Sequence, residues 1–186
     1  MTESTNEWDV IGLDLSLTST GVAIGDDTYV VAPQKLTGPE RLQFFRTKIH
    51  ELVAMRMYDV GPRIFVAIEG YSFASRHSHA HALGELGGVM RLWFYDHQIP
   101  YVDIPPTSRA KFATGKGNAG KSEVVSAISA RTGIFWDGPG NDDRCDAWVL
   151  QEMGLTYFGR ERYNWPATHR DALSKIAWPT LIGGEE

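Results

Sequence analysis

The stretch VIGLDLSLTSTGVAIG, from Val10 to Gly25, decides the fold of this chain. Its aliphatic first half predicts a buried strand over Val10–Leu15, and a tight Ser/Thr turn then leads to a second strand that ends at Ile24. Strands joined by so short a turn pair antiparallel, so the stretch predicts a hairpin.

Asp14 interrupts the aliphatic run of the first strand. A carboxylate in such a place is costly unless a cation compensates its charge. One interpretation is a metal ligand or catalytic acid at the edge of a sheet. The other is an acid that caps the turn through Ser16 or Thr18.

The composition indicates one folded domain with an arm. At 186 residues the chain can bury a full core without disulfides, and its lone cysteine, Cys145, indicates a reducing compartment such as the cytoplasm. The polar start at Met1–Glu7 does not resemble a signal peptide, and no run is long enough for a membrane span. The net charge of −5 argues against indiscriminate nucleic-acid binding but permits a local basic groove.

The rest of the chain predicts a mixed α/β sheet over residues 1–157. A helix between two strands normally makes them parallel, whereas the short turns of the first three strands make those antiparallel. The further predicted strands are Thr28–Ala32, Arg63–Glu69 and Tyr101–Ile104, and the predicted helices are Pro39–Met57, Ser78–His97, Ser122–Arg131 and Asp143–Tyr157.

The segment 158–186 differs from the domain before it, because its aromatic residues lie among prolines and charges without periodicity. We expect an arm that packs on the domain or on a second subunit. A base-stacking surface is the alternative.

Carboxylates stand out on three predicted elements: Asp14 and Glu69 on strands, and Asp143 with Asp146 on the last helix. Residues three apart share a helix face, so the last two can point at one site. Together these acids suit Mg²⁺ or Mn²⁺, and two such ions can drive phosphodiester hydrolysis. Alone, the helical pair would be solvated helix-start acids, and whether Asp142 replaces Asp143 as a ligand stays open.

Two other motifs offer rival chemistry. Gly115 to Ser122, GKGNAGKS, fits the phosphate-loop pattern of nucleotide triphosphatases, which is meaningful only where it links a strand to a helix. The preceding RAKFAT is not strand-like. His77, His79 and His81 form H-x-H-x-H, but no further ligands for zinc cluster nearby in the sequence.

Five segments together resemble RuvC-type Holliday-junction resolvases: IGLDLSLTSTGVAI, VAIEGYSF, ALGELGGVMR, GKGNAGKSEVV and DDRCDAWVL. They occur in the family's order and spacing from about Val10 to Leu150. The resemblance implies a ribonuclease H-like fold with a mixed five-stranded sheet flanked by helices. It also implies a homodimeric, metal-dependent endonuclease that nicks branched DNA, with Mg²⁺ or Mn²⁺ as cofactor and two ions per site.

The resemblance implies catalytic, metal-binding and DNA-binding roles for particular residues. The catalytic and metal-binding acids are Asp14, Glu69, Asp143 and Asp146, and the glycine-and-lysine loop supplies Lys121 as a further catalytic residue. The expected DNA contacts are Tyr71, Phe73, Arg76, Arg109, Lys111, Lys116 and Lys121.

Three departures from the family pattern affect these roles. The family's second active-site lysine falls on Ala110, between Arg109 and Lys111, and neither Tyr71 nor Phe73 has the usual offset of the aromatic inserted into the junction. The aromatic tail and the acidic net charge suggest a divergent, phage-borne member.

The helix Ser78–His97 is the expected dimer interface, because Gly84, Gly87 and Gly88 permit close helix contact. A phosphate-loop triphosphatase, a sugar-kinase or actin-like ATPase, and a non-catalytic module that binds branched DNA are the rival functions. The ATPases of the second kind need two such domains, for which the chain is too short.

Overall fold

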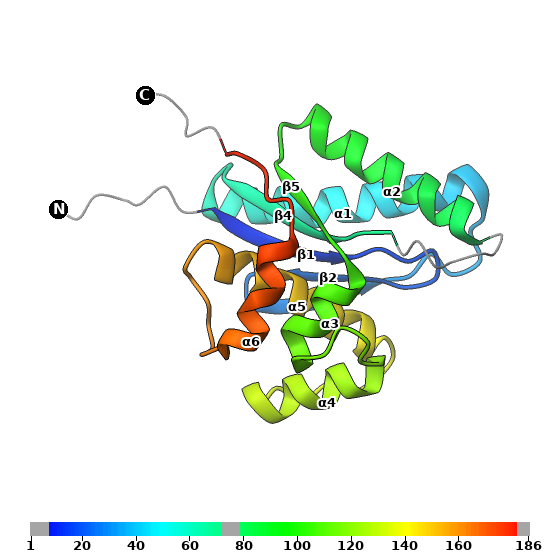
Figure 1. Cartoon of the computed structure of the whole chain (residues 1–186). Coiled ribbons are helices and arrows are strands. Elements are labelled where there is room, and N and C mark those ends of the chain that lie inside the picture. The colour runs from blue at the N-terminus through cyan, green and yellow to red at the C-terminus, as the bar shows by residue number, and fades with distance from the viewer. Residues whose placement is uncertain (1–7, 72–78, 182–186) are drawn as a thin grey trace, which may run out of the picture.

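The computed structural model describes residues 8–71 and 79–181, which form a five-stranded sheet with helices on both faces (Figure 1). The strands are β1 (Asp9–Asp14), β2 (Thr20–Ile24), β3 (Asp27–Val31), β4 (Ile64–Glu69) and β5 (Tyr101–Ile104). The helices are α1 (Gly38–Val60), α2 (His79–Asp96), α3 (Pro106–Thr114), α4 (Lys121–Thr132), α5 (Asn141–Tyr157) and α6 (Ala167–Arg170), followed by a 3₁₀ helix, η1 (Asp171–Lys175). No described helix is long and apolar enough to cross a membrane.

The sheet is mixed, as the sequence predicts, and its strands lie in the order β3-β2-β1-β4-β5. β2 pairs antiparallel with both β1 and β3, whereas β4 pairs parallel with β1 and with β5. Because Leu13 pairs with Ile68 in the parallel β1–β4 ladder, the next residues, Asp14 and Glu69, lie side by side at the carboxyl edge of the sheet.

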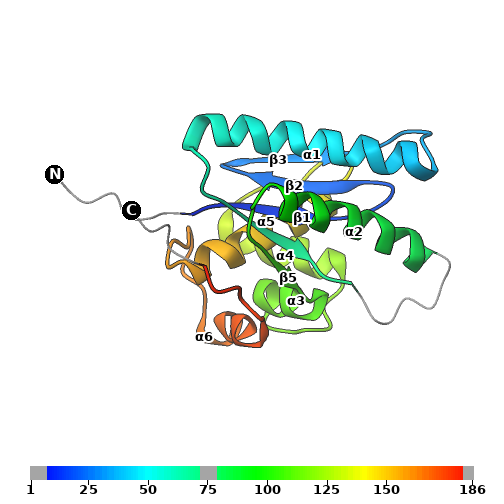
Figure 2. The same ribbon diagram turned by 90° about the horizontal axis from the view of Figure 1, so that it is seen from above.

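The two faces of the sheet bury separate hydrophobic clusters, since successive strand residues face opposite sides. Ile11, Leu13, Val66 and Ile68 pack with residues of α1 and α2. Val10, Phe65, Ala67 and Val102 pack with residues of α3, α4 and α5. Figure 1 shows α1 and α2 above the sheet and the other helices below it, so in the view from above (Figure 2) α1 and α2 lie on the near side. Asp14 shares the parity of Val10 and therefore faces α5.

Two strand glycines let α5 lie directly on β1 and β2. A Cβ atom at Gly12 would lie 1.9 Å from the carbonyl oxygen of Ala147, and one at Gly21 would lie 2.0 Å from that of Asp143. No side chain fits in either place, so helix backbone contacts strand backbone. This contact holds Asp143, and three residues later Asp146, beside the carboxyl end of β1.

The structure differs from the sequence-based expectation in α3, which that expectation omits. Pro106 lies in the first turn of α3, where a proline costs no helical hydrogen bond, so the Pro-Pro pair that ends β5 also begins a helix. Gly115, with φ of 82°, ends α3 in the left-handed region. The first strand also ends one residue early, so Asp14 is its last residue and not an interior one.

The arm, over its described residues 158–181, packs across the face that holds α3 and α5 (Figure 1). Glu152 of α5 has a fully buried side chain, and it accepts hydrogen bonds from the Arg162 backbone N–H at 2.9 Å, Arg162 Nε at 2.8 Å and Trp165 Nε1 at 3.1 Å. The Trp165 ring lies 4.3 Å from that of Phe112, between centroids. The helices α6 and η1 of this arm have no counterpart among the predicted elements.

Candidate active site

Asp14 and Glu69 form the floor of a carboxylate cluster at the carboxyl edge of β1 and β4. Burial raises the pKa of Asp14 well above its ordinary value of 3.8, and the adjacent Glu69 carboxylate raises it further. The charge of Arg109 acts in the opposite direction, and that of Asp143 adds a smaller increase. Acids from β4 and α5 therefore lie close enough to Asp14 to raise its pKa.

α5 supplies the other two acids from its first two turns. The side chain of Asp143 is 14% exposed and that of Asp146 is 2% exposed, so neither is a fully solvated helix-start acid. Oδ2 of Asp146 is buried and has no hydrogen-bond partner among the described residues. A buried carboxylate oxygen without a donor is costly unless a cation approaches it.

Arg109, from α3, lies within this cluster. Its Nε donates to Oε1 of Glu69 at 2.6 Å, and its Nη1 donates to Oδ1 of Asp146. The Arg109 side chain is only 10% exposed. The expected role as a contact to DNA phosphate does not fit a guanidinium that is buried between two acids.

The sequence contains a signal for this placement that the first interpretation missed. Glu69 pairs with Ile104 at the end of β5, so the first turns of any helix after β5 must lie beside Glu69. Arg109 lies in that part of α3. Predicting a helix over residues 106–114 would therefore have placed Arg109 beside Glu69.

Lys121, at the start of α4, approaches the cluster from the solvent side. Its Nζ donates to Asp142 Oδ2 at 2.8 Å and to Asp143 Oδ1 at 3.2 Å. Partial burial acts to lower the pKa of Lys121, but its contacts with Asp142 and Asp143 outweigh that effect and leave the pKa raised. The hydrogen bond from Lys121 lowers the pKa of Asp142.

The cluster has the donor chemistry of a site for a hard divalent cation. Its ligands would be carboxylate oxygens, which Mg²⁺ and Mn²⁺ prefer, and the unpartnered Asp146 Oδ2 is available. Within residues 8–71 and 79–181, however, no three His, Cys, Asp or Glu side chains already stand at metal-binding spacing. The Arg109 guanidinium lies between two of these acids, Glu69 and Asp146.

The remaining expected DNA contacts that the structure describes, Tyr71, Lys111 and Lys116, lie outside the cluster. The Tyr71 hydroxyl donates to the Gly84 carbonyl at 3.2 Å and accepts from Arg91 Nη1 at 3.0 Å. Lys111 pairs with Asp171 of the arm, and the exposed Lys116 lies 3.3 Å from Glu123 Oε1. Phe73 and Arg76 lie outside the described residues.

The turn after β1 does not depend on Asp14. The Ser16 N–H donates to Thr20 Oγ1 at 3.1 Å, and the Thr18 N–H donates to Ser16 Oγ at 3.4 Å. A capping carboxylate would have its pKa lowered by such donors, whereas that of Asp14 is raised. These observations favour the interpretation of Asp14 as a site residue.

The phosphate-loop interpretation of Gly115–Ser122 lacks its required setting. A helix, α3, precedes the loop where the motif needs a strand. The loop instead joins α3 to α4 and places Lys121 beside the acids of α5.

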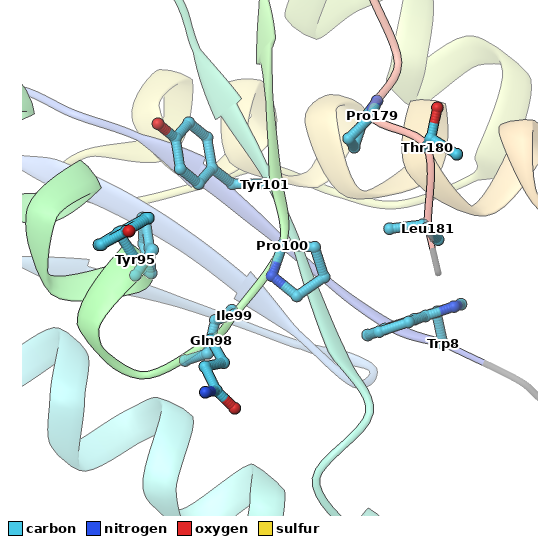
Figure 3. Close-up of a pocket in the computed structure, with 10 residues that line it drawn as sticks. Trp8, Tyr95, Gln98, Ile99, Pro100, Tyr101, Pro179, Thr180 and Leu181 are labelled. Carbon is cyan, nitrogen blue, oxygen red and sulfur yellow. The ribbon is translucent and has the colours of Figure 1, made fainter. Parts of the chain in front are cut away.

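An apolar cavity of about 650 Å³ lies away from the acids (Figure 3). Its lining includes Trp8, Pro100 and Tyr101, from the amino ends of β1 and β5, and Pro179 and Leu181 from the arm. The acids lie at the opposite, carboxyl ends of the strands, so this cavity is separate from the candidate site.

No family model matches the chain. It is 23% identical over 150 residues to the crossover junction endodeoxyribonuclease RuvC of Carboxydothermus hydrogenoformans, a match that covers 81% of this chain and 91% of that protein. Its structure is similar to that of T. thermophilus RuvC in complex with a Holliday junction substrate, with a TM-score of 0.63, 22% identity, and coverage of 85% of this chain and 100% of that one. A second Thermus thermophilus RuvC structure gives a TM-score of 0.57 at 20% identity, covering 83% of this chain and 99% of that one. These similarities show that the chain has the ribonuclease H-like fold of RuvC, and they confirm its resemblance to RuvC-type resolvases.

Proposed function

We propose that this protein is a metal-dependent endonuclease that nicks four-way (Holliday) junctions, and that it also accepts other branched DNA. One observation carries the proposal: Asp14, Glu69, Asp143 and Asp146 come from distant parts of the chain and gather at one edge of a RuvC-like sheet. Such DNA lies in the cytoplasm of a bacterium or a phage-infected host, where we place the protein.

These four acids are the proposed ligands of two Mg²⁺ ions, with Mn²⁺ as a substitute. Bound ions of this kind activate water and stabilise the leaving oxygen of a phosphodiester. The protein itself fixes the ligands: β1 and β4 hold Asp14 and Glu69, and the glycine contacts hold the start of α5. Lys121, half-exposed beside Asp143, is placed to neutralise charge that develops on the scissile phosphate.

For DNA binding we propose Lys116, on the loop before α4, and Lys121, at the start of α4. We add Tyr71, Phe73 and Arg76, which follow β4 in the sequence. Lys116 is supported by its exposure, with 70% of its side chain accessible. Lys111 is a weaker candidate, since its ammonium group pairs with Asp171.

We also propose a homodimer, because paired nicks in a near two-fold symmetric junction require two active sites. The outer face of α2 supports this: a Cβ atom at Gly84 or Gly88 would meet nothing within 4 Å, and Leu92 and Tyr95 are 61% and 78% exposed. These residues recur at helical spacing and form one stripe. Gly88→Glu should therefore reduce the mass measured by light scattering, whereas Tyr58→Glu on the exposed face of α1 should not.

Cleavage of end-labelled four-way junctions, with and without Mg²⁺, tests the activity. We expect nicks with ligatable 5′-phosphates in Mg²⁺ or Mn²⁺, and binding without efficient cleavage in Ca²⁺. Asp14→Asn should abolish cleavage and keep binding, whereas Asp96→Asn, at an exposed acid at the end of α2, should leave both cleavage and binding unchanged. A wild-type protein that binds junctions but cuts none in either metal would be the non-catalytic module.

A further inference from the structure

Arg109 is the most deeply placed cation of the acid cluster, and its position needs an explanation. A buried arginine requires an acidic partner, and one carboxylate balances its charge. Arg109 instead bridges two acids, one at the end of β4 and one on α5, and both belong to the proposed metal-binding set.

The charges around Arg109 divide into separate groups. Lys121 pairs with Asp142 and Asp143 at the solvent side, whereas Arg109 pairs with Glu69 and Asp146 in the interior. Asp146 uses one oxygen for Arg109 and has no partner for the other among the described residues. The inner pair of acids is therefore neutralised in the same place where a divalent ion would have to bind.

We propose that Arg109 is a resident counterion, which holds Glu69 and Asp146 together in the metal-free protein and competes with the divalent ion for them. This inference rests on the proposed function, because it takes these acids as metal ligands. Arg109 is thus a positioning residue that sets metal affinity.

The geometry of α3 supports competition over a purely structural role. A planar guanidinium can bridge two carboxylates, a task that the single ammonium of a lysine performs less well. The backbone next to Arg109 is held in place, since Nδ1 of His169 hydrogen-bonds the Phe112 carbonyl oxygen at 2.7 Å and Lys111 pairs with Asp171. Release of the acids therefore requires the Arg109 side chain to move, with α3 staying where it is.

The test is calorimetric titration of the full chain with Mn²⁺ alone, without DNA, at pH 8. Arg109→Gln removes the competing charge, so we expect it to bind Mn²⁺ roughly tenfold more tightly than the wild type, equivalent to about 1.4 kcal/mol. Its melting temperature in EDTA should fall, because Glu69 and Asp146 then repel each other. Arg109→Lys keeps the charge but loses the bridge, so its affinity should lie between the two.

Arg56→Gln is the matched control, because Arg56 also makes a double contact with an acid, Asp9, at 2.7 and 2.8 Å, away from the cluster. It should lower the melting temperature without changing Mn²⁺ affinity. If Arg109→Gln does not fold, Arg109→Lys decides alone, with tighter binding supporting the inference. Unchanged or weaker Mn²⁺ binding by the Arg109 variants, with wild-type cleavage intact, overturns the counterion role only. A wild type that neither binds Mn²⁺ nor cuts overturns the proposed function with it.

Discussion

Replacing Arg162 by methionine should remove the ionic contact between the arm and α5. The resulting loss in the free energy of unfolding measures how much this contact stabilises the domain. Arg162 Nε lies 2.8 Å from Oε2 of Glu152, and Arg162 Nη2 donates to Gln151 at 2.9 Å. The Glu152 side chain is 0% exposed, so its charge has no access to water. A methionine side chain replaces the apolar stem of Arg162 but lacks the guanidinium, so the substitution mainly removes the charge.

The expected loss follows from leaving Glu152 as a buried charge without its cation. Breaking such a pair costs about 3–5 kcal/mol, because the remaining charge is uncompensated. The Arg162 backbone N–H and the Trp165 indole still donate to Glu152, which favours the lower part of that range. For a chain of this length the melting temperature should fall by roughly 6–15 °C.

Urea unfolding followed by tryptophan fluorescence and circular dichroism measures the change. The double variant Arg162→Met/Glu152→Gln should recover more than half of the loss, since a neutral amide remains in place of the charge. Lys48→Met, which breaks an exposed pair with Glu51 on α1, should cost at most about 1 kcal/mol. A loss below about 1 kcal/mol for Arg162→Met would refute the stabilising role of the Arg162–Glu152 pair. So would a double variant whose loss equals the sum of the losses of the two single variants.

Other substitutions test the site and its support. The folded state holds the proton of Asp14 more tightly than the unfolded chain does, so the contribution of Asp14 to the stability of the metal-free protein should fall as the pH rises from 3.8 through the folded-state pKa. Asp14→Asn should remove that fall and raise the melting temperature in EDTA at pH 8, and a lower melting temperature would contradict it. Lys121→Ala should reduce cleavage much more than junction binding, whereas Lys116→Ala should weaken binding and flatten its salt dependence by about one unit; equal effects on both would show that the roles are misassigned. Gly12→Ala should prevent folding, as judged by circular dichroism, because its Cβ atom would meet the Ala147 carbonyl oxygen; a folded, active variant would contradict the close contact of α5 with β1.

Much of the fold follows from local pattern, because the strands at the centre of the sheet are short, predominantly apolar runs. Tyr101–Ile104 matches β5 in the structure, and Asp143–Tyr157 begins only two residues inside α5. The topology also follows from local features, since short turns impose antiparallel pairing and crossover helices impose parallel pairing.

What the sequence did not reveal depends on contacts between distant segments. α3 is short and begins at the second of two prolines, so its pattern resembles a loop, and its burial comes from neighbours such as Trp165 of the arm. The glycines at positions 12 and 21 read as ordinary strand residues until α5 is placed on them. The role of Arg109 is of the same kind, since a basic residue in a basic stretch indicates a nucleic-acid contact unless its acidic partners are known.

The two cations at the acid cluster differ in depth, and that difference assigns them different tasks. Lys121 has 58% of its side chain exposed, at the start of a helix, so a phosphate arriving from solvent can reach its ammonium group. Arg109 has 10% of its side chain exposed and lies between two acids, so its guanidinium is in contact with those acids and shielded from a DNA backbone. A cation that binds the DNA phosphate must be accessible from solvent, as Lys121 is. A cation that positions the proposed metal-binding acids must lie between them, as Arg109 does. Lys121 is therefore the residue whose loss should be felt in the cleavage of bound junctions, and Arg109 the residue whose loss should be felt in the affinity for metal.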